Sequence, residues 1–149
     1  LHRDVKLMDR GFDMARIFCY GSLRRGFGNH DLLATSTYVG DAISEGRWSM
    51  LNLGGFPGIA EHGNTAIVGE LYDVDADTLK RLDWLEDHPN FYRRTPISVR
   101  RISVPSAECS EAAWETADAY VLPVKWADRY VVLRSGDWAR RDLPDGGHR

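Results

Sequence analysis

Glu86 stands out among the residues that could do chemistry, because its spacing places a carboxylate on the apolar side of a helix. At about 100° per residue, Leu79, Leu82 and Glu86 share one face of the helix expected over residues 75–88. Burial and the negative end of the helix dipole both disfavour the ionised form of a glutamate there. A glutamate with a raised pKa on a rigid element suits general acid/base catalysis near neutral pH.

The same position also has a purely structural interpretation. Glu86 at the rim of the helix would form an ion pair with Arg93 or Arg94, which follow shortly after the helix. Asp83 lies on roughly the same face and competes with Glu86 for the acid/base role. The spacing alone leaves these alternatives open.

A second feature is the turn YGSLRRG, residues 20–26, which follows the apolar run at 15–20. Neither GxxxxGK[ST] nor a GxGxxG opening a helix is present, so a phosphate cradle is only weakly indicated. The backbone N–H groups of such a turn can form a nest for a carboxylate or oxyanion, and glycine lets the main chain approach the ligand closely. The alternative is a plain hairpin corner with Arg24 and Arg25 in solvent.

Cys19, directly before this turn, is a candidate nucleophile only if a base lies nearby. A cysteine hydrolase using Cys19 with His30 is therefore a third hypothesis, but no sequence spacing ties a histidine to this thiol. Free cysteine is among the most buried residue types, so a structural role in the core is favoured.

The elements that must position these residues are mostly strands. Short apolar or alternating runs predict strands at 15–20, 48–53, 66–74, 94–104 and 117–122. Asp75 is a good N-cap for the one clear helix, and Asn29 for a helical turn to Leu33. GGFPG at 54–58 is typical of a loop. Five or six strands with one or two helices indicate an α+β fold with a small mixed, barrel-like sheet.

Composition is that of an ordinary globular protein. The chain has 149 residues, 43% of them hydrophobic and 28% charged, with a net charge of −3, which gives no sign of a nucleic-acid partner. No apolar run approaches the roughly 20 residues that span a membrane, and neither of the two cysteines has metal-ligand spacing, so a cytoplasmic setting is expected. Residues 1–13 are expected to be a flexible leader or arm before a single domain over 14–149.

Several of these motifs together resemble the γ-glutamylcyclotransferase-like superfamily, most closely its γ-glutamylamine cyclotransferase, AIG2-like branch. The motifs are YGSL at 20–23, an Asn-His pair at 29–30, the GGFPG loop, GELYDV at 69–74 and LDWLEDHPNFYRRT at 82–95. The likeness runs from Arg16 to Tyr120 and resumes at SGDW, residues 135–138.

The resemblance implies a small closed β-barrel flanked by helices, and a reaction. The α-amine of a γ-glutamyl group attacks its own γ-carbonyl, giving 5-oxoproline and a free amine. By position, Glu86 matches the catalytic glutamate. Residues that would bind the substrate are Tyr20, Gly21, Ser22, Leu23 and Tyr92.

The resemblance implies a reaction that needs no cofactor or metal. The expected partner is a small-molecule γ-glutamyl substrate, without nucleic acid or membrane. The protein itself would be a monomer or a weak homodimer. The Arg24-Arg25 pair and the GGFPG loop would border the side of the leaving amine. A member of the same fold that binds a small ligand without chemistry is the alternative.

Overall fold

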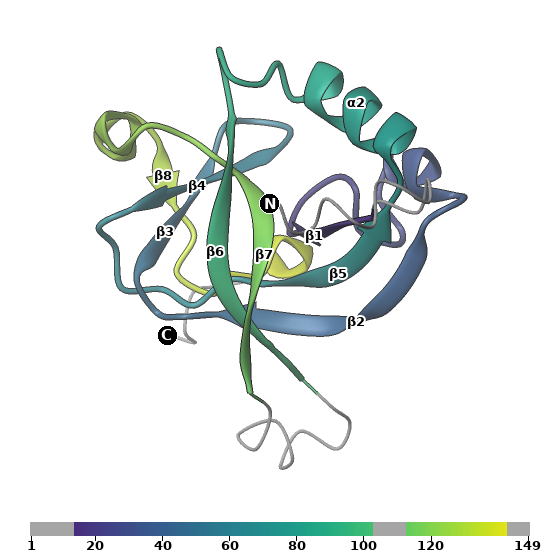
Figure 1. Ribbon diagram of the computed structural model, residues 1–149. Helices are drawn as coiled ribbons and strands as arrows, with labels where there is room; N and C mark the ends of the chain where they lie inside the picture. The colour runs from purple at the N-terminus through teal and green to yellow at the C-terminus, as the bar shows by residue number, and fades with distance from the viewer. Residues whose placement is uncertain (1–13, 103–112, 143–149) are drawn as a thin grey trace.

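The structure, a computed structural model, describes residues 14–102 and 113–142, and Figure 1 shows its strands and its one long helix. The strands are β1 (Ala15–Cys19), β2 (Thr37–Ser44), β3 (Trp48–Asn52), β4 (Pro57–Glu61), β5 (Val68–Val74), β6 (Arg93–Arg101), β7 (Trp114–Val121) and β8 (Val131–Val132). The helix is α2 (Ala76–Leu85), and short 3-10 turns are η1 (His30–Leu33), η3 (Val124–Asp128) and η4 (Trp138–Arg140).

Five of the strands close into a barrel. They pair in the order β1-β5-β2-β6-β7, and a parallel contact between Ile17 and Asp118 joins β7 back to β1. β4, β3 and β8 extend the sheet from β7, and the contact of β4 with β7 is also parallel, at Ile59 and Val121. The predicted α+β class and barrel-like sheet are confirmed.

Alternation along β1 explains why both faces of this strand are apolar. Phe18 packs into one buried cluster with Leu71 of β5, while Ile17 and Cys19 belong to a second cluster that includes Leu82 of α2. Successive side chains of a strand point to opposite faces, so β1 contributes to both sides of the sheet. The strand is therefore firmly held up to Cys19, where the turn begins.

The sequence prediction missed three strands. β2 was not predicted, because its alternation is interrupted by Gly40, where the pairing with β5 shifts register. β4 begins at Pro57, within the stretch predicted as a loop, so the loop is shorter than expected. β8 consists of only two residues, too few for a recognisable pattern.

α2 begins as predicted but ends earlier. The Asp75 carboxylate accepts a hydrogen bond from the Thr78 amide at 2.8 Å, which is the expected N-cap. The helix ends at Leu85 rather than at His88, since Asp87 adopts a left-handed conformation with φ of 55°. Glu86 is consequently the C-cap residue, at the exit of the helix.

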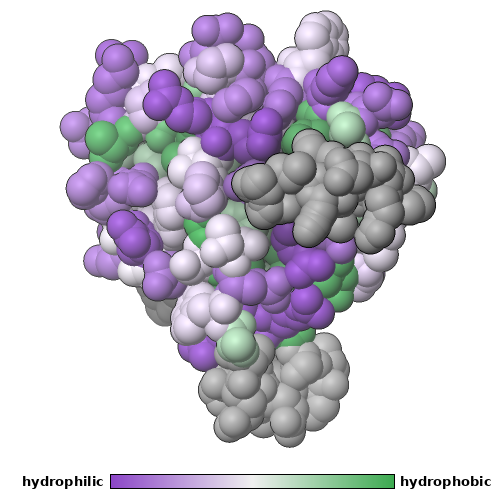
Figure 2. All heavy atoms as spheres, in the orientation of Figure 1, coloured by the Kyte–Doolittle hydropathy of each residue, from purple (hydrophilic) through white to green (hydrophobic). Residues whose placement is uncertain are grey.

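The surface in the view of Figure 2 is mainly hydrophilic, with hydrophobic residues in small separate patches. Trp138 in the C-terminal segment packs into the core, whereas Val131 on β8 is 69% exposed. Within the described residues, no helix is long and apolar enough to cross a membrane. The predicted arm at 1–13 lies outside the described residues.

Candidate active site

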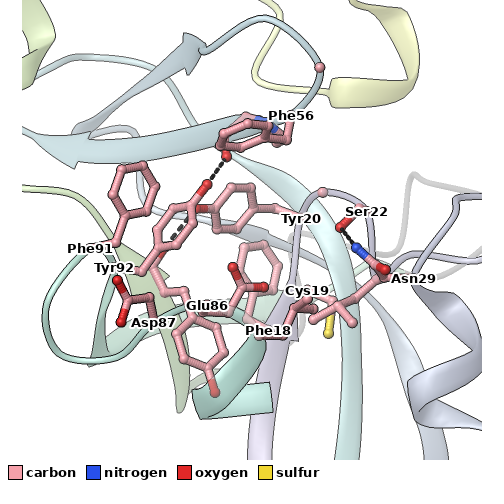
Figure 3. Close-up of a pocket in the computed structure, with 16 residues that line it drawn as sticks. Phe18, Cys19, Tyr20, Ser22, Asn29, Phe56, Glu86, Asp87, Phe91 and Tyr92 are labelled. Atoms are coloured by element: carbon pink, nitrogen blue, oxygen red, sulfur yellow. Dashed lines mark hydrogen bonds between the residues drawn. The ribbon is translucent and has the colours of Figure 1, made fainter. Parts of the chain in front are cut away.

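A cavity of about 460 Å³ lies where three segments meet: the turn after β1, the loop before β4 and the segment after α2 (Figure 3). All six residues predicted for the site line this cavity. They are Tyr20, Gly21, Ser22, Leu23, Glu86 and Tyr92. The first four and the last two are more than sixty residues apart in sequence, and the fold brings them together.

Glu86 enters the cavity from the end of α2, and Figure 3 shows its carboxylate among aromatic side chains. Burial raises the pKa of this carboxyl to about 7. Among the described residues, no group donates a hydrogen bond to it and no cation pairs with it. The carboxyl can therefore exchange a proton with a ligand near neutral pH.

Asp83, the competing carboxylate, is fully engaged elsewhere. Its two oxygens accept hydrogen bonds from Arg94 at 2.9 and 3.1 Å, and one also accepts from the Tyr120 hydroxyl at 2.7 Å. Burial alone would raise its pKa, but these donors outweigh burial and hold the pKa of Asp83 below its usual value. Among the described residues, no ion pair joins Glu86 to Arg93 or to Arg94, so the structural interpretation of Glu86 as their ion-pair partner is wrong.

The turn after β1 presents unpaired backbone amides. It is closed by hydrogen bonds from Arg24 N to Gly21 O and from Asn29 N to Ser22 O, both at 3.0 Å. The N–H groups of Gly21, Ser22 and Leu23 donate to no described residue, although all three residues line the cavity. Consecutive free amides of this kind form an anion-binding nest.

The Asn-His pair shapes this turn. The Asn29 side-chain amide donates to Ser22 Oγ at 2.8 Å, and Nδ1 of His30 lies 2.9 Å from Leu23 O. A carbonyl only accepts, so Nδ1 carries the proton in that contact.

Cys19 is an unsuitable nucleophile, although it lines the cavity. Cys19 is only 3% exposed, and burial raises the pKa of its thiol. No hydrogen bond links Cys19 to His30. A thiolate is needed for attack, so a core role is favoured for Cys19.

Tyr92 fixes the end of the loop that faces the turn, at the residue where β4 begins. Its hydroxyl donates to the carbonyl of Pro57 at 2.5 Å, and its ring is 6% exposed. Pro57 also packs against Gly21, where an added Cβ would lie 2.8 Å from the proline Cγ. Glycine is required at this position because the turn and the loop approach each other so closely.

Tyr20 contributes to the cavity through packing. Its hydroxyl is already used, since it donates to the Tyr120 carbonyl at 2.6 Å. The ring forms part of the cavity wall beside Glu86 (Figure 3).

The two arginines of the turn do not line the cavity, so they do not border the leaving amine as expected. The Arg24 side chain is 13% exposed and the Arg25 side chain 53%, and both form ion pairs. Arg24 pairs with Asp137 at 2.9 Å, and Arg25 contacts Glu70 at 3.3 Å and Asp41 at 3.2 Å. Both arginines attach the turn to other parts of the fold.

The GGFPG loop was expected to border the substrate, and its Gly55, Phe56 and Pro57 do line the cavity, but the sequence did not indicate several other parts of the wall. The additional lining residues are Phe18, Cys19, Asn29, Leu85, Asp87, Phe91 and Tyr120. Phe56 and Phe91 lie 6.5 Å apart between ring centroids, on two segments that are distant in sequence. The motifs around them could have indicated proximity to the site, but not which side chains face it.

The arrangement places a carboxyl with a raised pKa and three consecutive free backbone amides in the lining of one cavity. In residues 14–102 and 113–142, no group of three or more histidine, cysteine, aspartate or glutamate side chains could hold a metal ion. Such a site suits acid/base chemistry on a substrate that carries a carboxylate or develops an oxyanion.

Fold and site together define a small barrel protein with a buried carboxylate in its cavity. Residues 17–140 match the family model "Gamma-glutamyl cyclotransferase, AIG2-like", and the chain belongs to this family.

Named relatives agree with this family. A protein of Methanocaldococcus jannaschii named "Putative gamma-glutamylcyclotransferase MJ1514" is 43% identical over 128 residues, covering 84% of this chain and 96% of the relative. The mouse "Gamma-glutamylaminecyclotransferase" is 34% identical over 99 residues, covering 58% of this chain and 64% of its own. The crystal structure of a mouse AIG2-like protein superimposes with a TM-score of 0.65 at 25% identity, over 74% of this chain and 78% of that one.

Proposed function

We propose that this protein is a γ-glutamyl cyclotransferase that converts the γ-glutamyl group of a γ-glutamyl amide to 5-oxoproline and releases the amine. One observation carries the proposal. The Glu86 carboxyl, with a pKa raised to about 7, shares a cavity with the free amides of Gly21, Ser22 and Leu23. Membership of the family supports the same reaction class.

In the proposed mechanism, the Glu86 carboxylate takes a proton from the substrate's α-ammonium group. The neutral α-amine then attacks the γ-carbonyl carbon, a C–N bond forms, and the carbonyl π electrons move to oxygen as an oxyanion. The free amides of the turn stabilise this oxyanion, hold the α-carboxylate, or divide these tasks. Closing a five-membered ring is intramolecular, so holding the chain curled lowers the entropic part of the barrier.

The second half of the reaction uses the proton that the Glu86 carboxylate took up in the first half. The former α-amine nitrogen gives its extra proton to solvent, and the leaving nitrogen gains a proton from the Glu86 carboxyl. As the tetrahedral intermediate collapses, the oxyanion electrons re-form the carbonyl π bond. The bond from the γ-carbon to the leaving nitrogen then breaks, and its electron pair stays on that nitrogen. Glu86 returns to the carboxylate, and one carboxyl serves both steps.

The charge of the cavity favours an amine over an amino acid as the leaving group. The described lining residues include two carboxylates, Glu86 and Asp87, and no lysine, arginine or histidine. A second carboxylate on the leaving side would face like charges without a cation. The name of the mouse relative, a γ-glutamylamine cyclotransferase, agrees with this preference.

A substrate panel tests both parts of the proposal. The protein is incubated with γ-glutamyl-n-butylamine and with γ-glutamylnorvaline, which has the same carbon chain plus one carboxylate. Release of 5-oxoproline is followed by mass spectrometry. We expect product from the amine with a kcat/KM about tenfold or more above that for the amino acid. An equal or reversed preference would contradict the claim that the charge of the cavity favours an amine as the leaving group.

The same panel separates the enzyme from a binding module. Saturable binding of γ-glutamyl-n-butylamine in calorimetry with no 5-oxoproline released would support the non-catalytic alternative. The cysteine hydrolase hypothesis predicts sensitivity to Cys19→Ser, whereas we expect that variant to retain turnover.

A further inference from the structure

We propose that Glu70 is a positioning residue that holds the substrate-binding amides of residues 21–23 in place from behind. This role rests on the proposed function of the turn. Glu70 lies in β5, is only 5% exposed, and does not line the cavity. The residue therefore acts through the turn and not by touching substrate.

Glu70 is a buried carboxylate surrounded by donors. One oxygen accepts from the Arg25 backbone N–H at 3.0 Å and from the Tyr72 hydroxyl at 3.0 Å, and the other accepts from Arg25 Nε at 3.3 Å. Burying a carboxylate costs several kcal/mol unless such partners offset it. A charge retained here at that cost indicates a specific task.

The geometry of these contacts identifies the task. The backbone of Glu70 pairs with Cys19, the last residue of β1, directly before the turn. Its side chain accepts a hydrogen bond from the backbone N–H of Arg25. Arg25 directly follows Arg24, whose N–H closes the turn by donating to Gly21 O. One residue thus fixes both ends of the segment that carries the three free amides. The spacing of those amides depends on this clasp, which consists of Glu70 and Arg25.

A second attachment holds the same turn from another direction. Arg24 donates to Asp137 at 2.9 Å, and the side chains are 13% and 19% exposed. Asp137 also accepts from the Ala139 amide at 3.0 Å, so the contact is anchored in the SGDW segment. This accounts for the SGDW motif without placing it in the cavity.

The test compares Glu70→Gln with a matched ion-pair variant on the same strand. Gln keeps the shape of the side chain but loses the charge that faces Arg25 at 3.3 Å and Arg24 at 4.0 Å. The control is Asp73→Asn, because Asp73 accepts two hydrogen bonds from Arg16 at 2.8 and 3.0 Å, and neither residue lines the cavity.

We expect kcat/KM for 5-oxoproline release to fall about tenfold or more in Glu70→Gln and to stay near wild type in Asp73→Asn. The apparent pKa of the kcat/KM profile should be the same in all three proteins, since Glu86 is untouched. Arg25→Ala keeps the backbone N–H and should have a smaller effect than Glu70→Gln. Equal kcat/KM values in Glu70→Gln and Asp73→Asn, or a shifted pH profile in Glu70→Gln, would overturn the proposal.

A readout that does not depend on catalysis is the ¹H–¹⁵N spectrum of the free protein. The amide signals of Gly21, Ser22 and Leu23 should shift or broaden in Glu70→Gln and not in Asp73→Asn. Unchanged signals would contradict the clasp even if activity fell. If wild type releases no 5-oxoproline, the proposed function fails, and the spectra still decide whether Glu70 positions the amides.

Discussion

At the scale of single residues, two carboxylates on one helix have opposite environments. Asp83 accepts hydrogen bonds from Arg94 and Tyr120, which keep it ionised, whereas Glu86 has no donor among the described residues and burial raises its pKa. Only a group whose pKa is near the working pH can both accept and return a proton efficiently. The environment, not the residue type, therefore selects Glu86 for the proposed chemistry.

Asp83→Asn should separate stability from activity. The change removes the charge facing Arg94 and should lower the free energy of unfolding by about 1–3 kcal/mol, measured by urea denaturation. The rate of 5-oxoproline release at 25 °C should remain close to wild type, because Asp83 does not line the cavity. A folded variant with abolished turnover would transfer the acid/base role to Asp83.

Glu86→Gln should stabilise the protein at alkaline pH. The carboxyl has a pKa of about 7 when folded against 4.5 as its ordinary value, so the folded state binds the proton more tightly. Wild-type stability is then highest below pH 4.5 and falls as the pH rises through 7, by about 3 kcal/mol at most. Urea unfolding should show a more stable Gln variant at pH 8 and no advantage at pH 4.5. A less stable variant at pH 8 would contradict the buried charge.

The sequence was sufficient to find Glu86 but not Glu70. A glutamate in register with Leu79 and Leu82 departs visibly from a helical pattern. Glu70 lies between apolar residues of a strand, and its partner Arg25 is 45 positions away. Only the pairing of β1 with β5 makes that contact recognisable.

At the scale of elements, the cavity depends on a turn and a loop that are locked together. Gly21 packs on Pro57, and the Tyr92 hydroxyl holds the carbonyl of the same proline. Neither contact belongs to a helix or strand pattern. The sequence therefore predicted the turn and the loop separately, without their contact.

Tyr92→Phe should loosen this contact without emptying the cavity. Loss of the hydrogen bond to Pro57 should lower kcat/KM several-fold and reduce the free energy of unfolding by about 1 kcal/mol. Tyr130→Phe is the matched control, since Tyr130 is 37% exposed and does not line the cavity. If both variants behave alike in the 5-oxoproline assay, the Tyr92 hydroxyl does not position the loop.

Element prediction succeeded where patterns were local. The N-cap at Asp75 was predicted and is confirmed by its hydrogen bond to Thr78. β2 and β4 were missed because glycines and a proline interrupt or begin them, and pairing with neighbouring strands stabilises such segments regardless of local preference.

At the scale of the whole molecule, closure of the barrel brings the site together. The parallel contact of β1 with β7 completes a ring of five strands (Figure 1). A barrel-like sheet followed from the number of strands, but the ring order and the extension through β4, β3 and β8 depend on contacts between distant strands. These contacts leave no local signature in the sequence.

We expect the protein to be a monomer or a weak homodimer in solution. The edge strand β8 has only two residues, which is a short edge for pairing with a second copy. The exposed apolar side chains of Tyr130, Val131 and Val132 would support at most a weak association. Sedimentation velocity should give the mass of one chain once the protein is diluted. A dimer that persists on dilution would contradict this prediction.

The most direct test of the account is the rate of 5-oxoproline release from γ-glutamyl-n-butylamine by wild type and by Glu86→Gln at pH 8. Asp77→Asn, an exposed acid at the other end of α2, serves as the matched control. We predict that wild type and Asp77→Asn turn over alike, whereas kcat in the folded Glu86→Gln variant falls by a factor of about 10²–10⁴. Near-wild-type turnover by Glu86→Gln would contradict the assignment of the proton transfer to Glu86.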